Sequence, residues 1–314
     1  MLQSFHKEIL GIYLVEMKHA YLIIAHNEPK ILSILVSSLK QDSRNDVLVH
    51  IDKKVKGTVY SELETAVLNG GGKICSVRVS VSWGDFSQIR AEMALFDEAA
   101  KGKYDYYHLL SGVDLPIKPI AEIGDFFEEH PNQVFLRCVP DDESNMKHVR
   151  FCTDYYHFMG VRDIPYIGKI WQHLHLRRLL VFIQQIMGMS RCAKDDFKMY
   201  KGDQWVSLSH DAVEYLLSRK DFIFKRFSYC CCPDEIYKHT VLMNSQFHDR
   251  VYQPECSNQN AMLRLIDWKR GIPYVWTMEE KDEILASGNF FARKFSTQKD
   301  DEIVDYIDKI LSDK

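Results

Sequence analysis

One acidic residue, Asp114, follows a run of residues that favours a buried strand. Residues 106–110 are aromatic and aliphatic, and Ser111-Gly112 ends the run shortly before Asp114 and Pro116. In an open α/β sheet, ligands bind outside the carboxyl ends of the strands. The pattern therefore predicts a strand that delivers Asp114 to a ligand-binding edge, and an ordinary core strand closed by a turn is the competing interpretation.

A second acidic residue, Glu235, stands at a predicted helix start. Pro233 suits the first turn of a helix, and the helix macrodipole favours the acids Asp234 and Glu235 there. The same field stabilises an ionised carboxylate. Glu235 is thus either a simple helix-start acid or a general base.

Two adjacent cations, Arg293 and Lys294, lie between aromatic residues. Phe290 and Phe291 precede them and Phe295 follows. A cation pair held by buried aromatic rings is more ordered than a solvated charge run, and it suits a pyrophosphate group.

The composition is that of a globular protein with a large core. Of 314 residues, 46% are hydrophobic and 27% are charged, and the net charge of −4 disfavours nucleic acid as a partner. The eight cysteines show no zinc-ligand spacing, and three are consecutive at 230–232. We therefore expect reduced thiols in a cytoplasmic protein and no metal bound through sulfur.

The first sixteen residues are expected to contribute little to the fold. The apolar run at residues 9–15 is too short to cross a bilayer, and no signal-peptide cleavage pattern follows it. Met17 is a candidate natural start, which makes residues 1–16 an N-terminal extension.

The next residues predict a βαβ unit that could bind a nucleotide. Strands are expected at 19–25 and 47–52 with a helix at 30–39 between them, and such apolar strands belong in a parallel sheet. Asn27 and Asp52 then lie where a base or ribose binds. No glycine-rich dinucleotide or P-loop motif follows the first strand, and a solvated turn remains the alternative for Asp52.

Trp83 lies at a predicted strand-to-helix turn. A third strand is expected at 74–81 and a helix at 88–100, with Trp83-Gly84 between them. Tryptophan at such a turn could stack on a flat ligand such as uracil, although core packing is its commoner role.

The middle of the chain is less regular. A helix at 120–130 and a strand at 133–138 precede residues 141–171, where Lys147, Arg150 and Tyr155 are candidate acceptor contacts. Residues 141–143 are acidic, which usually means a solvated loop and not a metal site. A basic amphipathic helix at 174–189 could cover the core, line an acceptor groove or touch an anionic membrane.

The remaining elements end in a closing helix. A strand ends at Trp268, Ser209 is expected to cap one helix and Thr277 another, with Glu280 completing a capping box. The predicted strands are 202–209 and 263–268, and the predicted helices are 210–219, 233–243, 277–287 and 300–311.

Taken together, these segments resemble the core-2/I-branching β-1,6-N-acetylglucosaminyltransferase family, which also contains the peptide O-xylosyltransferases. The matching residues are 21–27, 49–54, 82–87, 109–118, 202–205, 233–235 and 291–295, in the family's order.

The resemblance implies a GT-A-like α/β domain over residues 17–314, with a Rossmann-like nucleotide-binding half at 17–138 and an acceptor-binding and catalytic half at 139–314. A central mixed, mostly parallel sheet flanked by helices is expected. The family transfers sugar from a UDP-linked donor with inversion and without a divalent metal or other cofactor. In agreement, the turn at Asp114 carries one carboxylate where metal-dependent GT-A folds carry Asp-x-Asp.

The resemblance also implies roles for individual residues. Glu235 is the base, and Lys294 with either Arg293 or Arg270 replaces a metal at the leaving diphosphate. For the substrates, Asp52 and Trp83 hold the uridine, Asp114 lies near the donor sugar, and Trp268 stacks against the acceptor.

We therefore expect a bacterial enzyme that moves GlcNAc or xylose to a hydroxyl of a glycan or glycolipid in surface polysaccharide synthesis. Its expected location is the cytoplasm, with peripheral contact at the inner face of the cell membrane left open. The alternatives are a sugar- or nucleotide-binding protein that has lost its chemistry, and a glycoside hydrolase using Asp234 and Glu235. The hydrolase is disfavoured because adjacent residues at a helix start point in different directions.

Overall fold

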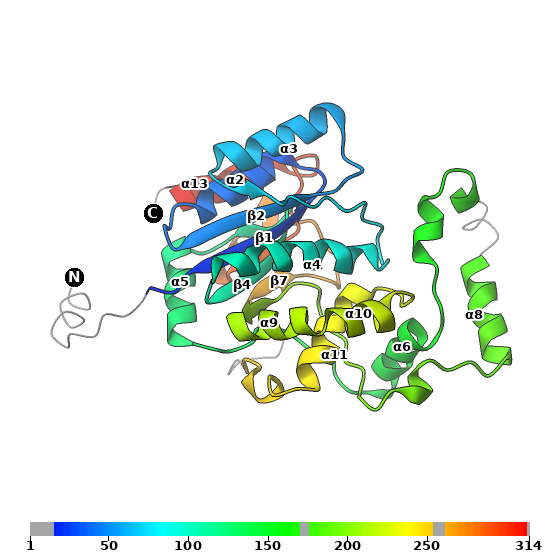
Figure 1. Ribbon diagram of the computed structural model, residues 1–314. Coiled ribbons are helices and arrows are strands. Elements are labelled where there is room, and N and C mark those ends of the chain that lie inside the picture. The colour runs from blue at the N-terminus through cyan, green and yellow to red at the C-terminus, as the bar shows by residue number, and fades with distance from the viewer. Residues whose placement is uncertain (1–15, 170–175, 254–260, 313–314) are drawn as a thin grey trace.

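A five-stranded sheet forms the centre of the protein (Figure 1). The computed structural model describes residues 16–169, 176–253 and 261–312, so the expected N-terminal extension lies almost wholly outside the described residues. The strand order is β3-β2-β1-β4-β6, in which the first four strands are parallel and β6 is antiparallel to β4. This confirms the expected α/β fold with a central, mostly parallel sheet. The strands are β1 (His19–Ala25), β2 (Asn45–Ile51), β3 (Lys73–Ile74), β4 (Tyr106–Ser111) and β6 (Ser207–Ser209).

Helices cover both faces of this sheet. Successive residues of a strand point to opposite faces, so Leu22 of β1 packs with Ile89 and Phe96 of α4, while Tyr21 and Ile23 belong to the other core. That second core is closed by α2, α3 and α13, which lie together above the sheet in Figure 1. Burial on both faces explains why the strands are continuously apolar. These helices are α2 (Pro29–Leu39), α3 (Gly57–Asn69), α4 (Ser87–Ala99) and α13 (Asp301–Ser312).

The other helices surround the second half of the sheet. They are α5 (Ile120–Glu129), α6 (Glu143–Asp154), α8 (Leu176–Ile186), α9 (His210–Ser218), α10 (Lys220–Phe227), α11 (Tyr237–Met243) and α12 (Lys281–Ala286). Short 3-10 helices are η1 (Ala100–Gly102), η2 (Met159–Asp163), η3 (Cys192–Lys194), η4 (Pro233–Glu235), η5 (His248–Arg250) and η7 (Met278–Glu280). Among the described helices, none is long and apolar enough to cross a bilayer.

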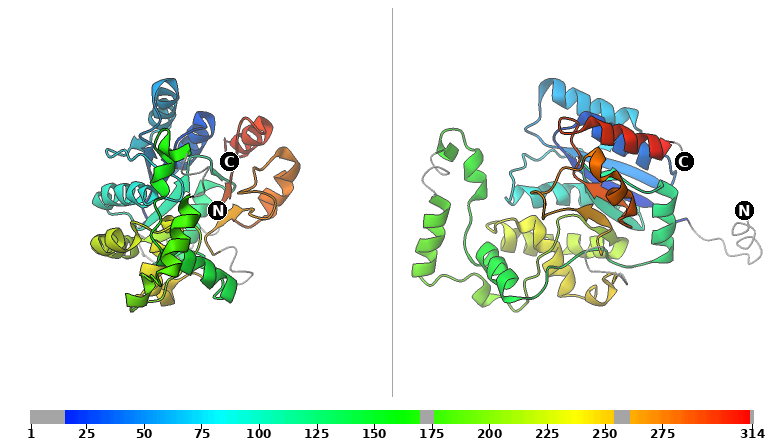
Figure 2. Two further views of the ribbon diagram at one scale, coloured as in Figure 1. Left: turned by 90° about the vertical axis from the view of Figure 1, so that its right-hand side faces the viewer. Right: turned by 180° about the vertical axis from the view of Figure 1, so that it is seen from behind.

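A small second sheet brings the end of the chain to the Asp114 turn. It has the order β5-β8-β7, with β8 antiparallel to β5 and parallel to β7. Figure 2 shows this C-terminal part, in orange and red, beside the central sheet. Pairing of Leu115 with Ala292 therefore places Arg293 next to the turn. The strands are β5 (Leu115–Pro116), β7 (Arg264–Ile266) and β8 (Phe291–Arg293).

Four predicted strands are shorter than expected, and the one predicted at 263–268 is strand only at Arg264–Ile266. The third strand stops at Ile74, because the chain then leaves the sheet and Val79 N–H bonds to the His50 side chain and not to a strand. Residues 133–138 form only isolated bridges, and of residues 202–209 only the last three are strand.

Some helices also differ from the prediction in their bounds. The region expected to be irregular contains α6, whose first turn is capped by the Asp142 carboxylate accepting from Asn145 N–H at 2.9 Å. The helix predicted at 233–243 is divided at Ile236 into η4 and α11. Ser209 occupies its expected N-cap position without a side-chain capping bond, whereas the Thr277–Glu280 capping box is confirmed.

Two buried histidines join neighbouring strands at the start of the sheet. His19 Nδ1 lies 3.0 Å from His108 Nε2, and His108 Nδ1 lies 2.8 Å from Ser207 Oγ of β6. Burial lowers the pKa of His19 to about 4, and it lowers the pKa of His108 well below its usual value. Both rings are therefore neutral at pH 7.

This pair predicts acid-sensitive stability. Because the pKa of His19 is about 4 when folded and 6.5 when unfolded, the unfolded chain binds the extra proton between these values, and stability falls as pH falls through that window. The slope is about 1.4 kcal/mol per pH unit for one histidine, or about 3 kcal/mol in total. Urea unfolding of His19→Gln should show a shallower pH dependence than wild type, and an unchanged slope would contradict the prediction.

Candidate functional site

A cleft of about 590 Å³ opens at the carboxyl edge of the central sheet. It contains five of the residues predicted from sequence: Asp52, Trp83, Glu235, Trp268 and Arg293. The structure thus brings together side chains from five separate stretches of chain. Its other lining residues are Ile24, His26, Lys54, Val55, Val81, Gln88, Ser111, Asp163, Asp203, Gln204, Trp205, Asp234, Ile272 and Pro273.

One wall of the cleft is built by the ends of β1 and β2. Asp52 directly follows β2 and is buried, and its Oδ1 accepts a bond from Lys54 N–H at 2.8 Å. Trp83 is 64% exposed and faces the cleft, so packing in the core does not account for it. Asn27 is exposed in the turn after β1 and is not among the lining residues.

The Asp114 carboxylate holds Arg293 in the opposite wall. Arg293 Nη1 donates to Asp114 Oδ1 at 2.9 Å, while Ser111 N–H donates to Oδ2 at 2.9 Å. The guanidinium also lies 4.4 Å from the centre of the Trp205 ring. Burial raises the pKa of Asp114, and the Arg293 charge opposes this shift. Asp114, only 1% exposed, therefore orients the cation and lies behind it.

The two other predicted cations lie in different surroundings. Arg270 pairs with Asp267 and, at 2.7 Å, with Glu283, outside the lining of the cleft. Lys294 is half-buried beside Arg293. Withdrawal from bulk water within the cleft lowers the pKa of His26, and the charges of Arg293 and Lys294 lower it further. Arg293 and Lys294 thus both act on His26, a lining residue of the cleft, whereas Arg270 does not.

Glu235 lines the cleft in an ion pair that the sequence did not reveal. Its Oε2 lies 2.6 Å from Lys201 Nζ, and the two side chains are 30% and 18% exposed. Burial alone would lower the pKa of Lys201, but the Glu235 carboxylate raises it. The lysine therefore stays charged and holds the glutamate at the surface of the cleft.

A buried polar network supports the segment that carries Glu235. Glu92 of α4 and Lys238 of α11 are fully buried and lie 2.5 Å apart. Glu92 also accepts bonds from Tyr237 Oη at 2.6 Å and from Gln204 Nε2 at 2.9 Å, and Lys238 Nζ donates to the Asp234 carbonyl at 3.1 Å. This network ties α4 to the turn at Glu235.

Asp234 differs from Glu235 in its surroundings. It is 4% exposed, and burial raises the pKa of its carboxyl group well above the usual value. Its Oδ1 has no hydrogen-bond partner among the described residues. Asp234 is therefore buried in the lining of the cleft, where burial favours the uncharged form of its carboxyl group, while Glu235 is paired with a cation.

The predicted acceptor contacts are divided. Trp268 is 48% exposed on the rim of the cleft, near the exposed Ile272. Lys147 and Arg150 are exposed on α6, and neither they nor Tyr155 line the cleft. The structure thus brings one of these side chains to the cleft.

The residues missed from sequence had weak but definite signals. Lys201 directly precedes the 202–205 segment, and Glu92 and Lys238 are charges among apolar helix residues. Only the fold shows that these charges meet.

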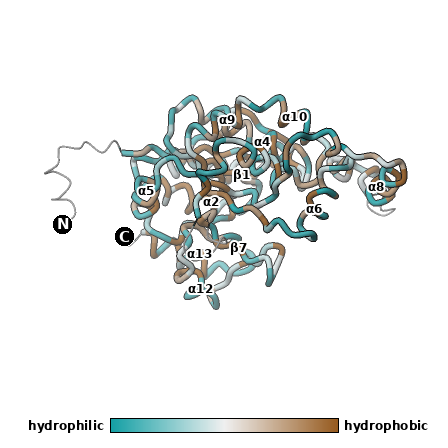
Figure 3. Tube along the Cα trace, turned by 90° about the horizontal axis from the view of Figure 1, so that it is seen from below, coloured by the Kyte–Doolittle hydropathy of each residue, from teal (hydrophilic) through white to brown (hydrophobic). Residues whose placement is uncertain are grey.

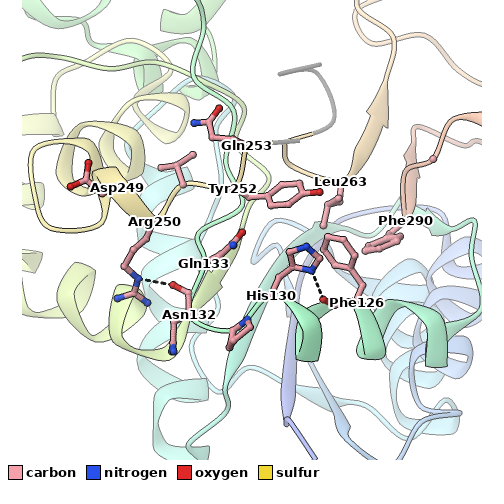
Figure 4. A pocket seen from close by; sticks show the side chains of 13 residues that line it. Phe126, His130, Asn132, Gln133, Asp249, Arg250, Tyr252, Gln253, Leu263 and Phe290 are labelled. Atoms are coloured by element: carbon pink, nitrogen blue, oxygen red, sulfur yellow. Dashed lines mark hydrogen bonds between the residues drawn. The ribbon is translucent and has the colours of Figure 1, made fainter. Parts of the chain in front are cut away.

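A larger cavity of about 990 Å³ lies elsewhere, at the amino end of β4 (Figure 4). Its aromatic residues Phe126 and Tyr252 pack edge to face with their ring centres 5.8 Å apart. Arg250 also lines it, and its Nε donates to the Asn132 carbonyl at 2.6 Å. It shares no lining residue with the cleft. The residues predicted to take part in chemistry line the smaller cleft instead.

The sequence over residues 19–284 matches the family model described as Core-2/I-Branching enzyme. The chain belongs to this family. The match spans both the wall that carries Asp52 and Trp83 and the turn that carries Glu235, and it identifies the protein as a member of a glycosyltransferase family.

Curated relatives are similar at low identity. Xylosyltransferase 1 of Rattus norvegicus is 24% identical over 84% of this chain and 32% of its own length. Xylosyltransferase 2 of the same organism is 20% identical over 92% of this chain and 33% of its own length. The family member thus spans about a third of the length of the curated relatives it matches.

A solved structure, the bifunctional glycosyltransferase WbbM in its apo form, is 11% identical and covers 90% of this chain and 46% of that chain with a TM-score of 0.41. A score this low carries no weight for fold or function.

Removing the buried Glu92 charge should destabilise this family member. Glu92→Gln leaves Lys238 buried without its counter-ion, which typically costs ~3–5 kcal/mol. Urea unfolding should show this loss, whereas Glu62→Gln on the exposed face of α3 should change little. If the free energy of unfolding of Glu92→Gln falls by less than about 1 kcal/mol, well under the usual cost of breaking a buried ion pair, the pair does not support the fold.

Proposed function

We propose that the protein moves a sugar from a UDP-linked donor to a hydroxyl of a glycan or glycolipid, with inversion at the anomeric carbon. The observation that carries this proposal is the cleft itself, where the Glu235 carboxylate and the Arg293 cation line one space. Transfer needs a base for the acceptor and a positive charge for the departing diphosphate. The family membership supports this use of the two groups.

In the proposed reaction, Glu235 acts as general base. Lys201 contacts Oε2, and Oε1 takes the proton from the acceptor hydroxyl. The acceptor oxygen then forms a bond to the anomeric carbon as the bond from that carbon to the diphosphate oxygen breaks. The electron pair of the broken bond leaves with UDP, and the single displacement inverts the configuration.

Arg293 and Lys294 stabilise the departing diphosphate in place of a metal ion. Asp114 and Trp205 fix the Arg293 guanidinium before substrate arrives, and preorganised charge of this kind is worth ~3–4 kcal/mol per donor. Arg270 is the weaker candidate because Asp267 and Glu283 already neutralise it. Among the described residues, no cluster of three or more His, Cys, Asp or Glu side chains could hold a metal.

We assign the two substrates to different walls. Asp52 and Trp83 bind the uridine, with Asn27 at the adjacent turn, and the donor sugar lies between them and Glu235. Trp268 stacks on the acceptor, and Lys147 and Arg150 serve only a long acceptor that extends beyond the cleft. GlcNAc and xylose are the favoured donor sugars, and xylosyl transfer is what the names of the curated relatives state. The proposed setting is polysaccharide synthesis in the cytoplasm.

Glu235→Gln should abolish transfer and spare donor binding. The amide keeps the shape of the side chain but cannot accept the proton, so turnover of UDP-GlcNAc or UDP-xylose on a glycan panel should fall by roughly 100-fold or more. Lys294→Ala should instead weaken UDP affinity by ~10-fold, measured by calorimetry. Glu62→Gln and Lys299→Ala are the matched exposed controls.

The reverse pattern, with Lys294→Ala binding normally and Glu235→Gln not, would refute both roles. Binding of a UDP-sugar by wild type without turnover on any glycan would favour the alternative of a binding protein.

Chelation of metals should leave donor binding intact. If fixed cations do the work of the ion, UDP affinity in EDTA should equal that in Mg²⁺ or Mn²⁺ within about twofold by calorimetry. Loss of binding in EDTA, restored by adding either ion, would contradict the cation-pair account.

A further inference from the structure

One segment of the protein carries most of its exposed apolar surface. Nine of the sixteen large apolar side chains that are exposed in the described residues lie between positions 158 and 187. We call residues 158–169 and 176–189 the arm. Figures 1 and 2 show it, in green, standing away from the main body beyond the carboxyl edge of the sheet. The nine are Phe158, Ile164, Tyr166, Ile167, Leu179, Phe182, Ile183, Ile186 and Met187.

Helix α8 of the arm presents an apolar face to solvent. Four of its apolar residues, Leu179, Phe182, Ile183 and Ile186, follow the spacing of a single helix face, and they are 44–70% exposed. Such a face is normally buried in a core. Figure 3 shows α8 at the edge of the molecule, apart from the other labelled helices.

The inward face of α8 is partly polar and firmly attached. Gln184 is 5% exposed, accepting from Tyr156 N–H at 2.8 Å and donating to the Tyr156 carbonyl at 3.1 Å. Arg177 Nη1 lies 3.4 Å from Met159 Sδ and 3.4 Å from Cys231 Sγ, and Val181 is buried. These polar groups hold the helix to the protein with its apolar face turned outward.

The charge of the arm is opposite to that of the whole chain. Residues 156–189 contain four Lys or Arg and one acid, Asp163, within a chain of net charge −4. That acid lies next to the main body, where it bonds to Ser82 and pairs with Lys54 at 3.1 Å. Lys169 and Arg178 are exposed beside the apolar residues. The outer surface of the arm is thus apolar and basic.

We propose that the arm is a docking surface for a bilayer that contains anionic lipids. Apolar side chains on one helix face enter the boundary between headgroups and acyl chains, and flanking Lys and Arg side chains attract lipid phosphates. A second copy of this chain fits less well, since a symmetric contact would bring the same positive charges together. The inference does not depend on sugar transfer, because binding to lipid needs no donor.

Docking would place the membrane beside the cleft. Asp163, at the end of η2 where the arm begins, is itself a lining residue of the cleft. A hydroxyl acceptor attached to a lipid could then reach Glu235 without leaving the surface. This second step rests on the proposed function: the arm would select acceptors by location, in addition to any contact with their sugars.

The test is sedimentation of the full chain with vesicles. Wild type should bind vesicles of phosphatidylcholine mixed with phosphatidylglycerol, and bind pure phosphatidylcholine much less. Phe182→Glu with Ile186→Glu should reduce binding to the mixed vesicles by ~10-fold or more, and Lys169→Glu with Arg178→Glu should remove the preference for phosphatidylglycerol.

The matched control carries the same charge change on other exposed apolar residues. Leu68→Glu with Val77→Glu, 56% and 53% exposed in wild type, should bind the mixed vesicles as wild type does. Circular dichroism melts should show that every variant is folded, because all substituted side chains are exposed.

Three outcomes would overturn the proposal. The first is equal binding of wild type to both vesicle types, and the second is equal binding of the Phe182/Ile186 variant and its control. The third is a wild type that does not bind vesicles but sediments as a dimer, with the Phe182/Ile186 variant monomeric, which would assign the face to a second copy.

Discussion

The buried ion pair between Asp114 and Arg293 is the interaction on which the rest of the site depends. It joins the turn after the central strand β4 to the last strand, β8. Two stretches far apart in sequence thus meet where Arg293 Nη1 donates to Asp114 Oδ1 at 2.9 Å. Removing either partner would leave a charge with little access to water, which is costly. The small sheet of β5, β8 and β7 supplies the backbone bonds that keep the pair aligned.

A second ion pair positions Glu235. Lys201 contacts Glu235, and below them the fully buried Glu92–Lys238 pair ties the Glu235 turn to α4. Each group that would act on substrate is thus held by a partner of opposite charge. Such positioning carries a cost in desolvation. Under the proposed function, the Glu235 carboxylate and the Arg293 guanidinium would need little rearrangement when a donor binds. In electrostatic catalysis, this preorganisation is the main source of rate.

Much of the fold could be predicted because its signals are local. The strands at His19–Ala25 and Tyr106–Ser111 and the Thr277–Glu280 capping box follow from apolar runs and cap residues alone. Residues Asp52, Trp83, Glu235, Trp268 and Arg293 were found together in the cleft. What the sequence could not predict was decided by distant contacts: the short third strand, the partner of Glu235, and the positions of Arg293 in the lining of the cleft and of Arg270 outside it, paired with acids.

The central claim is that Asp114 acts by fixing Arg293 for the diphosphate, and a double-mutant cycle on UDP affinity tests it most directly. Calorimetry on wild type, Asp114→Asn, Arg293→Gln and the double variant, all in EDTA, gives the coupling energy. The account predicts that each single change weakens binding and that the double variant binds no worse than Arg293→Gln, a coupling of ~1–3 kcal/mol. Losses that simply add, or UDP affinity unchanged in Arg293→Gln, would contradict it.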